Sequence, residues 1–149
     1  MSARADLATR DDVERLVRAF YGKALRDPVI GYLFEIAELD LEAHVPTMVD
    51  FWQTMVLGVR AYRGNAFSVH ARLHAKEPLT RAHFDRWLAL WTETVDELFA
   101  GERAELAKAH ATRVARAFAY RLAGRSEPLI PLRPPRPADG EDGADAAAP

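Results

Sequence analysis

Histidines are the candidate metal ligands of this chain. The sequence has five histidines and many carboxylates, and three of the histidines, His44, His70 and His74, stand out by their context. Imidazole binds iron, zinc and copper alike, so the residue type alone does not choose the metal. The chain has no cysteine, which excludes disulfides, thiolate metal sites, iron–sulfur clusters and cysteine nucleophiles.

His70 and His74 have a spacing that is also found in zinc sites. Residues four apart lie on one face of a helix, so both imidazoles could reach one ion. The intervening sequence, HARLH, has Ala71 where the zincin motif needs its catalytic glutamate. Zinc therefore stays an alternative that the motif does not favour.

A slot for a flat cofactor can form between the helices that carry His44 and His70. His70 follows a turn containing glycine, and Phe67 precedes it by about one helical turn. His44 shares a helix face with Met48 and Phe51. If the two helices oppose each other, the slot has apolar walls and an imidazole on each side. One histidine could then bind the axial metal of an apolar cofactor, and the other could face a small ligand.

Tyr21 and Trp87 would add hydrogen-bond donors to such a slot. Tyr21 belongs to the first predicted helix, and burying its hydroxyl without a partner costs free energy. Trp87 brings one indole N–H. Two buried donors beside a histidine would suit bound dioxygen, which carries partial negative charge.

Each candidate also has an ordinary structural interpretation. His70 could be a partly buried histidine, and His44 could be a capping or surface residue. Tyr21 could be a core tyrosine bonded to a backbone carbonyl, and Trp87 could fill the core with its N–H satisfied elsewhere. Apolar residues such as Phe51 would be buried in almost any helical protein.

Helical periodicity dominates the chain, and no segment shows a sustained alternating strand pattern. The pattern predicts an all-α fold. Thr9 and Thr80 are predicted N-caps, and Gly101 is a predicted helix stop. The predicted helices cover 10–26, 41–59, 66–73, 81–99 and 102–122, with a turn or a broken helix over 27–34.

Apolar stripes predict which residues of these helices face the core. In the first helix the stripe is Val13, Leu16, Val17, Phe20, Ala24 and Leu25. In the last helix it is Leu106, His110, Val114, Ala117, Phe118 and Leu122. His110 is expected to be a satisfied structural histidine. His83 is expected to be exposed in the first turn of its helix.

The composition predicts one folded domain with a different segment at each end. The 149 residues are 49% hydrophobic and 28% charged, as in ordinary globular proteins. Residues 1–8 are predicted to be a flexible N-terminus, and 9–124 the folded domain. Six of the nine prolines fall in 125–149, which predicts a disordered, proline-rich and acidic tail. Its PxxP matches leave open a polyproline-reading partner or a passive, solvated tail.

The charge and hydropathy of the chain exclude several partners. The formal net charge of −2 does not recommend nucleic acid or an anionic membrane. No apolar run approaches the roughly 20 residues that a membrane-spanning helix needs. The N-terminal sequence lacks the apolar core of a secretory signal, and the absence of cysteine is compatible with a reducing cytoplasm. We therefore expect a cytoplasmic protein.

The order and separation of four sequence segments resemble the group III truncated haemoglobins. The segments are RAFYGKALRDPVIGYLF around Tyr21, AHVPTMVDFW around His44, the turn GVRAYRGN that leads to His70, and HFDRWLALW around Trp87. The resemblance covers residues 9–123. It implies a shortened globin fold, a two-over-two helical sandwich around haem b.

The resemblance also assigns roles to residues of the slot. His70 would be the proximal ligand, binding haem iron through a neutral Nε2. Its Nδ1–H would need an acceptor such as the carbonyl oxygen of Ala66. Tyr21, His44 and Trp87 would form the distal pocket. The predicted cofactor contacts are completed by Phe34, Met48, Phe51, Phe67 and His74.

Three classes of function follow. The first is a globin that reversibly binds dioxygen or another diatomic ligand. The second is a haem enzyme with peroxidase or nitric oxide dioxygenase activity, which would need a reductase that the sequence does not identify. The third is a cofactor-free helical interaction module that uses the proline-rich tail.

Overall fold

The computed structural model describes residues 4–123 of the chain, and every regular element in that range is helical. The predicted all-α fold class is therefore confirmed. The predicted tail, 125–149, lies outside the described residues. The elements are α1 (Arg10–Ala24), α2 (Gly31–Ile36), α3 (Leu41–Trp52), a π-helical segment η1 (Gln53–Leu57), α4 (Ala66–Lys76), α5 (Arg81–Leu98) and α6 (Glu102–Ala123).

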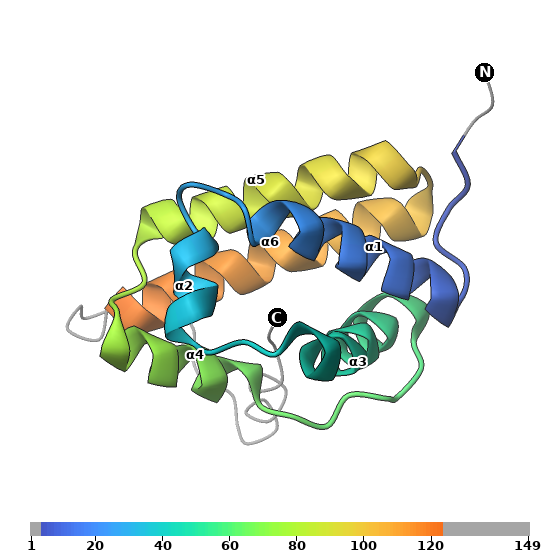
Figure 1. The fold of residues 1–149 in the computed structure, drawn as a ribbon. Helices are drawn as coiled ribbons and strands as arrows, with labels where there is room; N and C mark the ends of the chain where they lie inside the picture. The colour runs from blue at the N-terminus through green and yellow to red at the C-terminus, as the bar shows by residue number, and fades with distance from the viewer. Residues whose placement is uncertain (1–3, 124–149) are drawn as a thin grey trace.

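Two helix pairs make the body of the fold. The long helices α5 and α6 lie side by side, and α1 contacts both α3 and α5 (Figure 1). The short helix α2 follows the turn after α1, and α4 contacts α6 (Figure 1). Within the described residues, no helix is long and apolar enough to cross a membrane.

The segment just before α1 is anchored to the start of α6 through Ala5, Asp6 and Leu7. Leu7 is 1% exposed, and the amide of Ala100 donates to the carbonyl oxygen of Ala5 at 3.0 Å. The Asp6 carboxylate accepts from the backbone amides of Arg103 at 2.9 Å and Ala104 at 2.8 Å. Asp6 thereby satisfies amides that α6 itself leaves unpaired in its first turn.

Removing this cap is expected to lower stability. We predict that Asp6→Ala costs about 1–2 kcal/mol of unfolding free energy, the usual range for a lost helix cap. Urea unfolding followed by circular dichroism measures the change. Asp11→Ala, which removes an exposed carboxylate from the first turn of α1, is the control. Equal stability of wild type and Asp6→Ala would contradict the capping role.

The first helix begins as predicted and ends two residues early. Thr9 caps α1, because its hydroxyl accepts from the amide of Asp12 and the Asp12 carboxylate accepts from the amide of Thr9. The helix ends at Ala24, so Leu25 leaves the apolar stripe and is 39% exposed. The prediction that Leu25 faces the core is therefore wrong.

The segment after α1 is a tight turn followed by the short helix α2. Gly31 begins that helix, and a Cβ there would lie 2.9 Å from the carbonyl oxygen of Leu25. Only glycine allows α2 to approach the end of α1 so closely. This approach places Leu33 and Phe34 over the interior of the fold.

The predicted helix 41–59 is divided into two parts. α3 ends at Trp52, and η1 continues to Leu57 before Gly58 adopts a left-handed conformation with φ 76°. The Thr54 hydroxyl in η1 accepts from the backbone amides of Ala61 and Tyr62, both at 3.0 Å. The wider π turn therefore also holds the loop that leads to α4.

The predicted stripe of α6 is only partly correct. Val114 and Phe118 are buried, but Leu106 is 37% exposed and Ala117 is also exposed. The buried face consists of small residues, Ala104, Ala107, Ala111 and Ala115, together with Val114 and Phe118. α6 turns its alanines toward the interior because they allow close packing against α5. The bulkier Leu106 then falls on the outer side.

Candidate functional site

One large cavity opens within the helices and forms the candidate site. Its empty space is about 590 Å³, including the part open to solvent at its mouth. That size lies within the roughly 300–1,000 Å³ of small-molecule and cofactor sites. The lining is mostly apolar and comprises Tyr21, Ile30, Leu33, Phe34, His70, Leu73, Leu79, His83, Phe84, Trp87, Val114, Ala115 and Phe118.

His70 presents one free ring nitrogen within this cavity. α4 begins at the N-cap Asn65, whose side chain accepts from the amide of Ser68. One turn later, Nδ1 of His70 lies 2.9 Å from the carbonyl oxygen of Ala66, the predicted acceptor. A carbonyl oxygen can only accept, so Nδ1 carries the proton and Nε2 holds a lone pair. Nε2 has no hydrogen-bond partner among the described residues, and the ring contacts Phe118 at 5.2 Å between centroids.

The surroundings of His70 favour its neutral form. Burial lowers the pKa of His70, the hydrogen bond to Ala66 opposes this, and His44 acts in the same direction as burial. A neutral imidazole with a free Nε2 is the form that binds a transition metal. His70 is therefore in the form that can bind a metal ion through Nε2.

Tyr21 and His44 form a hydrogen-bonded pair from different helices. Tyr21 lies in α1 and is 5% exposed, and its hydroxyl is 3.0 Å from Nε2 of half-buried His44 in α3. Burial raises the pKa of Tyr21 and lowers the pKa of His44. Both groups are therefore neutral near pH 7, and the phenol keeps its proton. Tyr21 lines the main cavity, whereas His44 is not in its lining and contacts it through Tyr21.

Trp87 and Phe34 complete the wall around Tyr21. Both line the main cavity, and the Phe34 ring meets the Tyr21 ring edge to face at 5.8 Å between centroids. Trp87 is half-buried, and its indole N–H has no hydrogen-bond partner among the described residues. Its N–H is thus available to a molecule within the cavity.

Four other predicted contacts lie beside the cavity or away from it. Met48 is buried and lines a second, smaller cavity of about 200 Å³, and Phe51 is buried against Trp52 and Tyr62. Phe67 packs edge to face on Phe118 and lies under the guanidinium group of Arg121. His74 in α4 uses Nδ1 to accept from the amide of Leu79 at 2.9 Å. None of the four is in the main cavity's lining.

His83 lines the cavity although the sequence predicted an exposed residue. Its Nδ1 accepts from the amide of Thr80 at 3.0 Å, so Nε2 carries the proton and donates to the Tyr32 hydroxyl at 3.0 Å. That hydroxyl in turn lies 3.2 Å from the carboxylate of Glu77. The chain of bonds joins α2, the end of α4 and the start of α5. The sequence does not reveal these links, because Tyr32 is 45 residues from Glu77 and 51 residues from His83.

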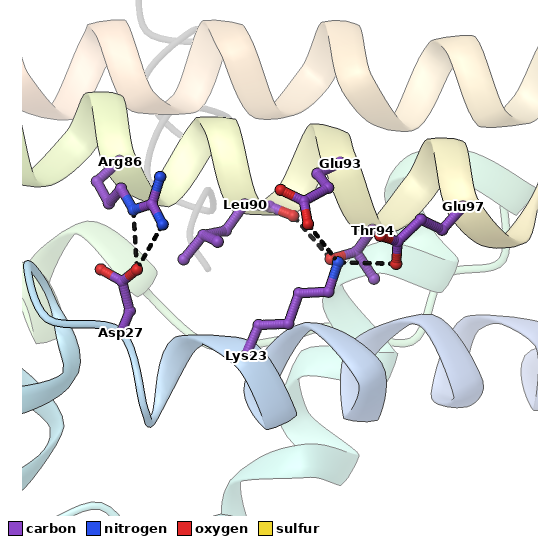
Figure 2. A network of polar contacts seen from close by, with 7 residues as sticks. All are labelled: Lys23, Asp27, Arg86, Leu90, Glu93, Thr94 and Glu97. Atoms are coloured by element: carbon purple, nitrogen blue, oxygen red, sulfur yellow. Dashed lines mark hydrogen bonds and ion pairs between the residues drawn. The ribbon is translucent and has the colours of Figure 1, made fainter.

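An ion pair between α5 and the turn before α2 supports the same wall (Figure 2). The Asp27 carboxylate accepts from Arg86 at 2.8 Å and from the amides of Val29 and Ile30 at 2.9 and 3.1 Å. The Arg86 hydrogen bond and these amides hold the pKa of Asp27 below its ordinary value, although burial opposes them. Figure 2 also shows Lys23 of α1 bound to Glu93 and Glu97 of α5. Together these contacts fix α1 and the turn before α2 to α5.

Removing the charge of Asp27 is expected to destabilise the protein. Its side chain is 3% exposed, so we predict that Asp27→Asn costs about 1.5–3 kcal/mol near pH 7. Because the pKa of Asp27 is lowered on folding, this stabilisation is complete above about pH 4 and is lost as the pH falls through the folded-state value. Urea unfolding of both proteins at several pH values should therefore show the difference shrinking in acid.

The control for this prediction is the exposed pair Arg81–Asp85. Its atoms are 3.6 Å apart and its side chains 79% and 66% exposed, so Asp85→Asn should change stability very little. A constant difference between wild type and Asp27→Asn down to pH 2 would contradict the predicted linkage.

The donor set indicates what kind of metal could be held here. Among the described residues, no group of three or more His, Cys, Asp or Glu side chains could hold a metal ion. A structural zinc site needs about four protein ligands and a catalytic one about three. A single half-buried imidazole in an apolar cavity instead suits a metal that arrives within a cofactor.

A sequence comparison and a structure comparison both find a similar protein. A scan against models of known protein families gives no match. The chain is 26% identical over 94 residues to a group 3 truncated hemoglobin of Campylobacter jejuni. The aligned region covers 60% of this chain and 72% of that protein. The crystal structure of group III truncated hemoglobin from Campylobacter jejuni matches with a TM-score of 0.70 and 24% identity, covering 80% of this chain and 94% of that one. The chain thus adopts the truncated globin fold, and its predicted resemblance to the group III truncated hemoglobins is confirmed.

Proposed function

We propose that this protein is a haem-binding globin that reversibly binds dioxygen or another diatomic ligand. The observation that carries the proposal is the free Nε2 of His70, a neutral imidazole within an apolar cavity that Tyr21 and Trp87 also line. The name of the curated relative, a truncated hemoglobin, supports the same conclusion.

The residues of the cavity fit a haem group. Its walls are apolar side chains, which suit a flat porphyrin, and His70 supplies an axial nitrogen. The hydrogen bond from Nδ1 to the Ala66 carbonyl fixes the tautomer and the plane of the ring, and it makes Nε2 a better donor to iron. When bound, haem b would supply the iron that takes the diatomic ligand.

Three residues of this chain would determine how strongly a polar ligand is held. Tyr21 keeps its proton because burial raises the pKa of its hydroxyl. If His44 donates Nε2–H to the Tyr21 oxygen, the phenol proton is free to point at the ligand. Trp87 adds an indole N–H that donates a hydrogen bond to no described residue. Donors aimed at the negative charge of bound dioxygen slow its release.

Absorption spectra of the purified protein test this proposal. They are recorded as isolated, after dithionite and after carbon monoxide. We expect a Soret band at one haem per chain and a sharp shift of that band with carbon monoxide. The absence of a Soret band from well-folded protein after haem addition would overturn the proposal and favour the cofactor-free interaction module.

A further inference from the structure

All three tryptophans of the chain form one stack that begins at the main cavity. Trp87 lines the cavity and lies nearly parallel to Trp91, with 7° between the planes and 6.2 Å between the ring centroids. Trp91 stacks in turn on Trp52 at 4.4 Å and 23°. Trp91 is 1% exposed and Trp52 is 2% exposed, so the stack leads from the cavity into the core.

Two more aromatic rings continue this line to the protein surface. Phe51 meets Trp52 edge to face at 5.1 Å, and it meets Tyr62 in the same way at 5.3 Å. Tyr62 is half-buried in the loop between η1 and α4, and its backbone amide is held by the Thr54 hydroxyl. The rings Trp87, Trp91, Trp52, Phe51 and Tyr62 are called the aromatic path below.

The chemistry of these side chains suits electron transfer. Indole and phenol are the aromatic side chains that lose an electron most readily, whereas the phenylalanine ring can only bridge a short gap. Electrons pass quickly between π systems whose rings are in contact. The aromatic path has three oxidisable rings in direct sequence, one bridging ring and an oxidisable ring at the surface.

We propose that the aromatic path carries electrons from Tyr62 at the surface to an oxidised haem group in the main cavity. This inference rests on the proposed haem site. It adds a second place at which the protein meets a reductant, at Tyr62, which does not line the cavity.

The electron balance needs a peroxide as the oxidant. Hydrogen peroxide takes up two electrons and two protons, its O–O bond breaks, and two molecules of water form. A haem group bound in the main cavity would supply the redox chemistry for this reduction, and the residues around it would have to return both electrons. Trp87 returns one electron. Tyr62 then replaces that electron by transfer through Trp52 and Trp91 to Trp87. Tyr62 releases its phenolic proton to water and becomes a neutral phenoxyl radical, which a phenol in solution reduces by giving up one electron and one proton. A second passage along the same path returns the other electron, so two phenols are oxidised for each hydrogen peroxide reduced to two molecules of water.

The positions of the other tyrosines make the proposal testable. Tyr32 is 40% exposed and Tyr120 is 52% exposed, and both are more exposed than Tyr62. The Tyr32 ring contacts His83, which is not a member of the aromatic path. Oxidation by diffusing radicals would follow exposure and favour Tyr120 and Tyr32. Transfer along the path would favour Tyr62.

The experiment treats the haem-loaded, full-length protein with one equivalent of hydrogen peroxide and a nitrone radical trap. Peptide mass spectrometry then locates the trap adducts, and the Soret band reports haem content. We expect the adduct chiefly on Tyr62 in the wild type. Trp91→Phe should keep its haem and still consume peroxide, but lose most of the Tyr62 adduct while any label on Tyr120 is unchanged.

A second variant keeps the test decisive if Trp91→Phe does not fold. Tyr62→Phe changes only a half-buried hydroxyl, and it should move the adduct back to Trp52 with normal peroxide consumption. Labelling that follows exposure in the wild type, with Tyr120 and Tyr32 ahead of Tyr62, would overturn the path. A protein that takes up no haem would instead overturn the proposed function, which the missing Soret band distinguishes.

Discussion

Replacing His70 by glycine is expected to abolish haem retention, and added imidazole should restore it. Among the described residues that line the main cavity, only His70 presents an unpaired imidazole nitrogen. The other nitrogen of its ring is hydrogen-bonded to the carbonyl oxygen of Ala66. Loss of a second-shell partner typically weakens metal binding by roughly 10–100-fold, and loss of the ligand itself should exceed that range. Haem titration followed at the Soret band measures the affinity directly.

The matched control for this variant lies on the same helix. Arg72→Gly places the same residue at an exposed position of α4, so it carries the cost of about 1 kcal/mol for a helical glycine without touching the cavity. It should bind haem as the wild type does. If His70→Gly retains the wild-type spectrum and affinity without imidazole, His70 is not the axial ligand.

Local signals in the sequence were enough to predict most of the helices. The N-caps Thr9 and Thr80 were predicted because a hydroxyl before an apolar run satisfies the first free amides, and both caps are present. The acceptor of His70 was equally local, since Ala66 lies one helical turn earlier. The π turn after Trp52 was missed, because nothing in the residue types distinguishes it from a continuing α-helix.

The walls of the cavity depend on contacts that a sequence does not display. The orientation of α6 depends on how closely alanines pack against α5, which is why Leu106 was assigned to the wrong side. The Asp27–Arg86 pair and the Tyr32–His83 bond join residues 59 and 51 positions apart. Periodicity describes one helix at a time, so it predicts neither link.

The predicted site residues likewise divide into those that line the cavity and those that lie elsewhere. Tyr21, Phe34, His70 and Trp87 do share one cavity. Met48 and Phe51 were predicted from a common helix face with His44, but that face is wide enough to serve two purposes. Its N-terminal end supports Tyr21 through His44, and the remainder, with Met48 and Phe51, packs against the tryptophan core.

The second large effect is expected at Tyr21. We predict that Tyr21→Phe speeds dioxygen release by about ten- to a hundredfold, the equivalent of a hydrogen bond worth about 1.5–3 kcal/mol. The phenyl ring keeps its contacts with Phe20 and Phe34, so the change removes the hydroxyl alone. Stopped-flow displacement of dioxygen by carbon monoxide gives the rate.

Carbon monoxide release from the same variant is an internal control, because bound carbon monoxide carries little charge and gains little from a donor. Its rate should change far less than that of dioxygen. Tyr120→Phe, at a residue 52% exposed on α6, should leave both rates unchanged. Because burial raises the pKa of Tyr21, the wild-type dioxygen rate should also stay constant up to about pH 10, the ordinary pKa of tyrosine. An unchanged dioxygen rate in Tyr21→Phe would transfer the donor role to Trp87, whose indole N–H is the other free donor in the cavity wall.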